Sequence, residues 1–160
     1  MQRAKRANEL VAWVNRILNT NDVRTLDDLK SGVHLVQIIH SIDPDRFDLS
    51  RVDFRASNDY YFTRNLKLLQ DVMEKLSIPN HFQLEGLMQG EKRNDLFGLV
   101  SYLKLHYPAL KGRVNSKAAL TYDPALQRKR AQEKRNAKHR PFRVAARSTA
   151  VTPAVSGVGA

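Results

Sequence analysis

Five histidines, several paired acidic residues and a surplus of arginine and lysine are the side chains of this chain that could do chemistry. Histidine acts as an acid, a base or a metal ligand only beside suitable partners. His34 and His40 are six residues apart, which places them on different faces of a helix, and the other three histidines are farther apart. We therefore expect structural or surface roles for the histidines, and no metal site.

The paired acidic residues also have a simpler explanation than catalysis. Asp27–Asp28 and Asp43/Asp45 stand at predicted helix ends, where a carboxylate commonly caps free backbone groups. The sequence has no phosphate-binding loop, dinucleotide-binding motif, zinc-protease motif or calcium-binding loop, and the absence of cysteine excludes disulfides and thiolate nucleophiles. We therefore expect a protein that is not an enzyme, with no catalytic residues, no cofactor and no small-molecule substrate.

The arginine and lysine residues are distributed unevenly along the chain. Residues 1–110 contain fifteen Lys+Arg and fourteen Asp+Glu, a net charge of +1, whereas residues 111–160 contain twelve and two, a net charge of +10. This asymmetry predicts a nearly neutral domain over residues 1–110 and a basic, low-complexity tail over residues 111–160 that is ordered only on a partner. Nucleic acid, anionic lipid or an acidic protein polymer would suit such a tail.

The elements that must position these cations are helices. Four stretches have apolar residues at spacings of three and four: residues 8–19, 33–42, 57–78 and 94–107. The third has the broadest apolar stripe and is predicted to be the central core helix. That stripe consists of Phe62, Leu66, Leu68, Leu69, Val72, Met73 and Leu76. Because no hairpin or strand–helix–strand pattern competes, the predicted fold class is all-α, a compact helical bundle.

Shorter elements connect these helices. Thr25 with Asp28 predicts a capping box that begins a short helix, and residues 82–90 predict another that ends at a glycine. Residues 45–56 contain aromatic and β-branched side chains, but they are few and have no partner strand. We therefore expect a loop there, held to the core by Phe47 and Phe54.

The last helix and the residues after it are predicted from weaker signals. Asn94 or Asp95 can cap the helix, which is expected to end at Pro108. Residues 111–122 are expected to be a linker. Residues 124–139 are rich in helix-forming residues but have no apolar face on which to fold alone.

Several short motifs carry a family resemblance. One run consists of Leu29, Ser31, Gly32, Gln37, Pro44, Val52, Phe54 and Ala56, and Tyr122-Asp123-Pro124 follows the last predicted helix. Together with ELVAWVNRIL, RNLKLLQ and LMQGEKRNDLFGLVSYLK, these motifs resemble the calponin-homology domain, and most of all its microtubule end-binding (EB) type. The resemblance covers residues 8–124 and implies the calponin-homology bundle. It also implies tubulin as the partner, because EB domains bind between tubulin subunits on the microtubule wall.

The resemblance also indicates where a tubulin contact should lie. The family's basic patch falls at Ser50, Arg51, Asp53 and Ser57 here, and its loop lysine falls around Glu91 and Lys92, so few of these positions remain basic. Either the binding pose is shifted and Arg55 and the basic tail compensate, or the preference for a growing microtubule end is lost. The tubulin-binding residues expected on this basis are Arg51, Arg55, Lys92, Arg93, Arg128, Lys129, Arg130, Lys134, Arg135, Lys138 and Arg140.

The sequence after Tyr107 has no apolar heptad of the kind that makes EB proteins dimers. The expectation is therefore a monomeric, non-enzymatic microtubule-binding protein of the cytoplasmic cytoskeleton, lattice-bound in a stable array such as the axoneme of a cilium, beside other microtubule-associated proteins. No stretch is apolar enough for a membrane span. Two alternatives stay open: a plus-end-tracking EB-type protein, if the chain is a fragment, and a nucleic-acid-binding protein that uses the basic tail.

Overall fold

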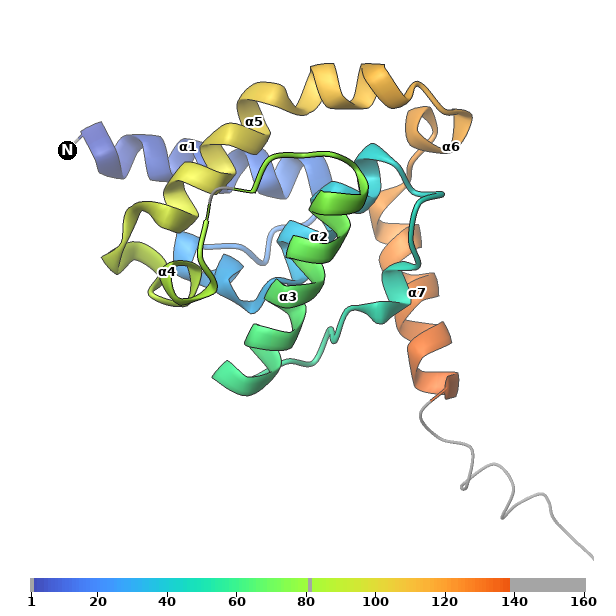
Figure 1. Cartoon of the computed structure of the whole chain (residues 1–160), viewed down its shortest axis with the longest axis horizontal. Coiled ribbons are helices and arrows are strands. Elements are labelled where there is room, and N and C mark those ends of the chain that lie inside the picture. Colours follow the sequence, from blue (N-terminus) through green and yellow to red (C-terminus); the bar gives the residue numbers. More distant parts are fainter. Residues whose placement is uncertain (1, 81, 139–160) are drawn as a thin grey trace, which may run out of the picture.

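The computed structural model describes residues 2–80 and 82–138, and every regular element in this part of the chain is helical (Figure 1). This confirms the predicted all-α class. The elements are α1 (Gln2–Leu18), η1 (Leu26–Ser31), α2 (Val33–Ile42), η2 (Leu49–Arg51), α3 (Asp59–Lys75), α4 (Leu84–Met88), η3 (Gly90–Lys92), α5 (Asn94–Val114), α6 (Lys117–Leu120) and α7 (Pro124–Lys138).

Helix α3 is the central element, as its broad apolar stripe predicts. It packs against α2, η1 and α4, and its fully buried side chains include Leu66, Leu69 and Met73. The helix begins where the Asn58 side chain accepts a hydrogen bond from the Tyr61 N–H at 3.3 Å, which satisfies one of the free donors of the first turn. Sequence periodicity and a local cap therefore both specify this helix.

Helices α1 and α5 close the bundle around Trp13. The Trp13 ring meets the ring of Tyr107 edge to face, with 5.6 Å between their centroids, and Trp13 is buried. Two predicted boundaries are wrong. Helix α1 begins at Gln2 rather than near residue 8, and α5 continues beyond Pro108 to Val114 because Leu110 packs into the core there. This tertiary contact outweighs the backbone hydrogen bond that proline cannot make.

The short elements agree with expectation except at two ends: the N-cap of α5, and the end of the helix predicted over residues 82–90, where α4 stops at Met88 and Gly90 begins η3. The Asp28 carboxylate accepts from the Thr25 N–H at 3.1 Å and begins η1, and residues 45–56 form a loop with one short turn, η2. The N-cap of α5 is Arg93, with no side-chain cap bond, rather than Asn94 or Asp95. A carboxylate in the first turn still suits the positive end of that helix.

The region after residue 110 differs most from the sequence expectation. Residues 111–122 are not a plain linker, because they complete α5 and form α6, in which Ala119 is buried. Helix α7 lies along the bundle beside η2, although it has no apolar face (Figure 1). For residues 111–138 the expected tail, ordered only on a partner, is therefore replaced by packing within the chain. The division of the chain at residue 110 stays a prediction.

Candidate functional site

Helix α7 docks on η2 mainly through polar contacts. Lys134 Nζ lies 2.5 Å from Asp48 Oδ2, and Arg135 Nη1 donates to the backbone oxygens of Ser50 at 3.1 Å and Arg51 at 3.3 Å. One small residue, Ala131, is buried in the contact. Burial raises the pKa of Asp48, but hydrogen bonds from Lys134 and Ser50 outweigh this effect and lower the pKa to about 2. The ion pair therefore persists through the physiological range of pH.

Arg128 holds the other end of α7 against α1. Its guanidinium donates to the backbone oxygens of Leu18 and of Asn19, the latter at 3.0 Å, and to Gln37 Oε1 at 3.3 Å. Leu18 ends α1, where the last carbonyl groups have no partner within the helix and a cation is favourable. Arg128 thus acts as a cap for α1 supplied from a helix more than a hundred residues later.

The Tyr122-Asp123-Pro124 motif forms the joint between the bundle and α7. Gln37 Nε2 donates to the Tyr122 hydroxyl at 3.3 Å and to the Pro124 backbone oxygen at 2.9 Å. The Asp123 carboxylate accepts from the Leu126 N–H at 3.2 Å, and Pro124 occupies the first helical position, where its missing N–H costs nothing. The motif therefore attaches, caps and begins α7.

His40 completes this joint from helix α2. Its Nδ1 lies 2.7 Å from the Tyr122 hydroxyl. Burial lowers the pKa of His40 to about 4, although Asp48 and Asp45 oppose the shift, and burial raises the pKa of Tyr122. The Nδ1 of neutral His40 can therefore accept a hydrogen bond from the Tyr122 hydroxyl, which stays protonated.

Lys111 stabilises the joint beside the rings of Tyr107 and Tyr122. Its Nζ donates to the backbone oxygens of Ser41 at 2.8 Å and Ala119 at 2.5 Å, and it lies 5.8 Å from the ring centroids of Tyr107 and Tyr122. Burial lowers the pKa of Lys111. This lysine ties α5, α6 and α2 together.

Asn65 of α3 fixes the loop that carries the predicted contact residues. Its side-chain amide donates to the backbone oxygens of Ser31 at 2.9 Å and Asp53 at 3.0 Å, and its Oδ1 accepts from the Asp53 N–H at 2.9 Å. Gly32 has φ +84°, and a Cβ there would lie 2.7 Å from the Asn65 Cβ, so only glycine fits. Arg51 and Arg55 flank this anchored segment.

The ten expected tubulin-binding residues that the structure describes therefore fall into three groups. Arg128, Lys134 and Arg135 are engaged within the chain. Four cations are exposed and form no ion pair with a described residue: Arg55, Lys129, Arg130 and Lys138. Arg51 is also exposed, and its Nη2 lies 3.4 Å from Asp71 Oδ2. Arg140 lies outside the described residues. We call the exposed cations around η2 and α7, including Arg51, the α7 surface.

Lys92 and Arg93 form a separate group. They belong to η3 and its end, which packs on η1 and α5 rather than on α7. Gly90 opens this turn with φ +59°, and the Glu91 N–H donates to Asp27 Oδ1 at 2.8 Å. Arg93 Nε lies 3.2 Å from Asp95 Oδ1. Figure 1 shows α4, which directly precedes η3 in the chain, on a different side of the bundle from α7.

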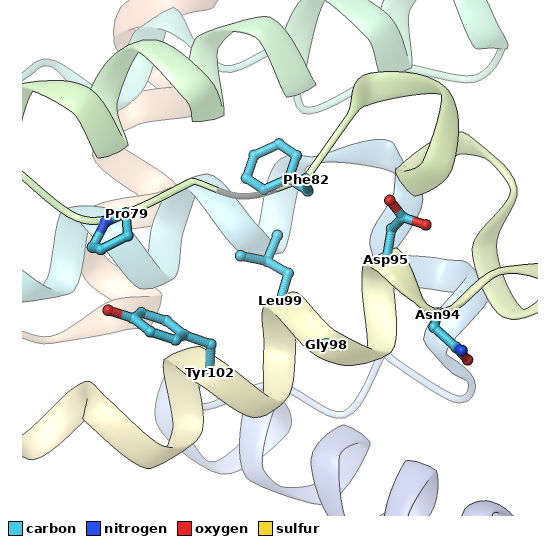
Figure 2. A pocket seen from close by; sticks show the side chains of 7 residues that line it. All are labelled: Pro79, Phe82, Asn94, Asp95, Gly98, Leu99 and Tyr102. Atoms are coloured by element: carbon cyan, nitrogen blue, oxygen red, sulfur yellow. The ribbon is translucent and has the colours of Figure 1, made fainter.

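A small hollow lies between α5 and the segment that follows α3. It has a volume of about 240 Å³, and Figure 2 shows Phe82, Leu99 and Tyr102 around it, with Asp95 as its one charged lining residue. No constellation for acid–base or nucleophilic chemistry is present there. Within residues 2–80 and 82–138, no group of three or more histidines and carboxylates is placed to hold a metal, and no helix is long and apolar enough to cross a membrane.

Sequence reasoning missed the intramolecular roles of Arg128, Asn65 and Tyr122. The position of Tyr122 was marked by its motif, but nothing in the motif indicates that the hydroxyl binds His40 and Gln37. Arg128 had no signal of its own, since its neighbours in the sequence are equally basic.

The match to a known family covers the bundle itself. Residues 4–109 match the calponin homology (CH) domain, and the chain belongs to this family. Within the family, its homology is to EB proteins. Microtubule-associated protein RP/EB family member 1C of Arabidopsis thaliana is 28% identical over 113 residues, which are 71% of this chain and 34% of that protein. Protein BIM1 of Saccharomyces cerevisiae is 28% identical over 152 residues, which are 94% of this chain and 42% of that protein.

A solved structure agrees with these relatives. A chain in "Structural Basis of Microtubule Plus End Tracking by XMAP215, CLIP-170 and EB1" has a TM-score of 0.64 and 28% identity, and the match covers 77% of this chain and 97% of that chain. The chain spans less than half the length of the two relatives named above. The CH fold with EB homology is therefore established, and the activity of whole EB proteins is not transferred with it.

Proposed function

We propose that this protein binds microtubules through the α7 surface and acts as a non-enzymatic structural component of the cytoplasmic cytoskeleton. The observation that carries this proposal is the homology of its CH domain to a microtubule-associated RP/EB protein and to a structure concerned with microtubule plus-end tracking. The chemistry of the surface supports it, because exposed arginine and lysine side chains suit an acidic polymer.

The docking of α7 gives this surface its shape. Lys134 and Arg135 fix α7 beside η2, so that the exposed Lys129 and Arg130 of α7 and the exposed Arg51 of η2 stand on two adjoining elements. A preformed surface loses less conformational entropy on binding than a disordered tail would. We propose that tubulin meets a rigid cationic face, and that residues beyond Lys138, including Arg140, add further electrostatic attraction.

Two finer proposals concern how the protein is used. We favour binding along the lattice of a stable array, such as an axoneme, because few positions of the EB basic patch remain basic in this chain. Plus-end tracking is the second candidate, and the likeness to the plus-end-tracking structure favours it. Fluorescence microscopy on dynamic microtubules separates the two: uniform decoration supports lattice binding, and comets at growing ends support tracking.

Co-sedimentation with microtubules tests the proposed partner. Arg55→Glu/Lys129→Glu reverses two exposed cations of the α7 surface, and Arg16→Glu/Arg24→Glu makes the same change of net charge at exposed positions that the proposal does not use. We expect the first variant to pellet weakly, the control to pellet like the wild type, and wild-type pelleting to fall as salt rises. Equal pelleting of all three proteins would refute the proposed surface, and retention on RNA but not on microtubules would favour nucleic-acid binding.

A further inference from the structure

A second cationic surface lies where α1 and α5 cross. Arg6, Glu9 and Leu10 are spaced three and four residues apart and share one face of α1, and Phe97, Ser101, Lys104 and Leu105 share one face of α5 in the same way. These seven residues line a groove of about 470 Å³. Arg3 and Lys5 lie beside it, and Arg3 stacks over the Phe97 ring at 4.6 Å. We call this region the α1–α5 groove.

The charges of the α1–α5 groove are not balanced within the described part of the chain. Arg3, Lys5, Arg6 and Lys104 are exposed, and none of them forms an ion pair with a described residue. Glu9 is the one carboxylate that lines the groove. Cations in the first turns of a helix are also electrostatically unfavourable, and α1 has no acidic residue in its first turn. A negatively charged partner would relieve this repulsion.

The groove also has an apolar centre. Leu105 is 76% exposed, which makes it the most exposed large hydrophobic side chain among the described residues. It adjoins Lys104 in sequence and lies in the groove with the half-buried Phe97. A partner that covered Leu105 would therefore gain apolar contact as well as ion pairs.

The α1–α5 groove lies along the first half of α1, whereas α7 contacts the last residue of that helix. The last residues of α1 touch α7 through Arg128, whereas Arg3 is fifteen residues earlier, which corresponds to about 22 Å along a helix. Figure 1 shows the marked N-terminus and α7 at opposite ends of the molecule. The two basic regions can therefore be occupied at the same time.

We propose that the α1–α5 groove is a second binding site, whose ligand is an acidic polypeptide segment with an apolar side chain between its carboxylates. In this arrangement the carboxylates meet Arg6 and Lys104, and the apolar side chain covers Leu105. One chain would then link an acidic partner to the polymer held by its α7 surface. The groove shares no residue with the α7 surface, so the two sites can be tested separately.

An acidic peptide fits this groove better than a membrane or RNA does. Membrane-surface helices present a stripe of large apolar residues beside the cations, but the exposed positions of α1 between Gln2 and Ala12 are polar, charged or alanine. Single-stranded RNA needs exposed aromatic faces for stacking, and the one aromatic ring of the groove is covered by Arg3.

The test is a fluorescence-anisotropy titration of the full chain with a labelled peptide in which glutamates surround one leucine. Arg6→Glu/Lys104→Glu should weaken binding roughly tenfold or more, because two attractions become repulsions. Leu105→Asn should weaken binding of this peptide but not of a peptide in which the leucine is replaced by glycine. The control Arg16→Glu/Arg24→Glu should bind like the wild type, and circular dichroism should show equal helix content for all variants.

Three outcomes would overturn the inference. The first is equal peptide binding by the wild type and by Arg6→Glu/Lys104→Glu. The second is equal weakening by Arg6→Glu/Lys104→Glu and by the control, which would indicate a general charge effect. The third is binding to vesicles that contain phosphatidylserine, lost in Arg6→Glu/Lys104→Glu, without binding to the peptide. Because no microtubules are present in this assay, its result does not depend on the proposed tubulin site.

Discussion

Replacing Arg128 with methionine should loosen α7 from the bundle. The substitution keeps most of the side-chain length but removes the donors to Leu18, Asn19 and Gln37. A hydrogen bond from a charged group contributes about 1.5–3 kcal/mol. The Asn19 carbonyl can recover water because Asn19 is exposed, so we expect a total loss of about 2–3 kcal/mol rather than the full sum for three bonds.

Urea unfolding measures the loss of free energy of unfolding directly. A thermal melt gives a second measurement: for a domain of this size each kcal/mol corresponds to about 2–4 °C in the melting temperature, so Arg128→Met should melt about 5–10 °C lower than the wild type. Arg130→Met is the matched control, because it removes the same charge from an exposed position on the same helix. It should leave stability nearly unchanged.

Hydrogen exchange then locates the change. We expect faster exchange of the α7 amides in Arg128→Met, with α3 protected as in the wild type until global unfolding. If Arg128→Met and Arg130→Met were equally stable and exchanged alike, Arg128 would not be the residue that holds α7, and its assignment as an internal contact would be refuted.

Three further predictions concern other parts of the bundle. Asn65→Ala should lower the free energy of unfolding by about 2–4 kcal/mol in urea titrations, because it leaves buried backbone groups unpaired. The pKa of His40 is lowered to about 4 in the folded protein, so between pH 6.5 and 4 only the unfolded chain binds a proton at this residue. The free energy of unfolding should therefore fall by about 3 kcal/mol as pH decreases through this window. His40→Gln should flatten this part of the plot of stability against pH. Gly90→Ala should be destabilising by about 1–3 kcal/mol in thermal melts, since a Cβ would meet Asp27 Oδ1 at a backbone φ of +59°, whereas Gly98→Ala, with open space around it in α5, should gain about 0.5–1 kcal/mol.

The bundle was predictable because its helices have regular apolar faces. Leu66, Leu69 and Met73 recur at helical spacing in the sequence and are all buried in the structure. Helix α7 was not predictable as a docked element for the opposite reason. Its contacts join arginine and lysine to backbone carbonyls, to one side-chain amide and to one carboxylate, and within α7 only Ala131 is buried. Periodicity of hydrophobic residues carries no signal for contacts of this kind.

The candidate site was predictable only in part. The sequence resemblance pointed to Arg51 and Lys92 together, but they stand on elements with different packing partners, since η3 packs on η1 and α5 while η2 packs on α7 and α2. The basic run from Arg128 to Lys138 looks uniform in sequence, and only the fold shows that it contains both internal contacts and exposed cations. Which cations touch tubulin stays a prediction.

A cryo-EM density map of microtubules decorated with the full chain tests the central proposal most directly. We predict that the bundle sits with η2 and α7 toward the microtubule wall, so that Arg55 and Lys129 face tubulin and the N-terminus of α1 points away from it. A map in which α7 faces solvent while the α1–α5 groove or η3 meets the wall would contradict this account.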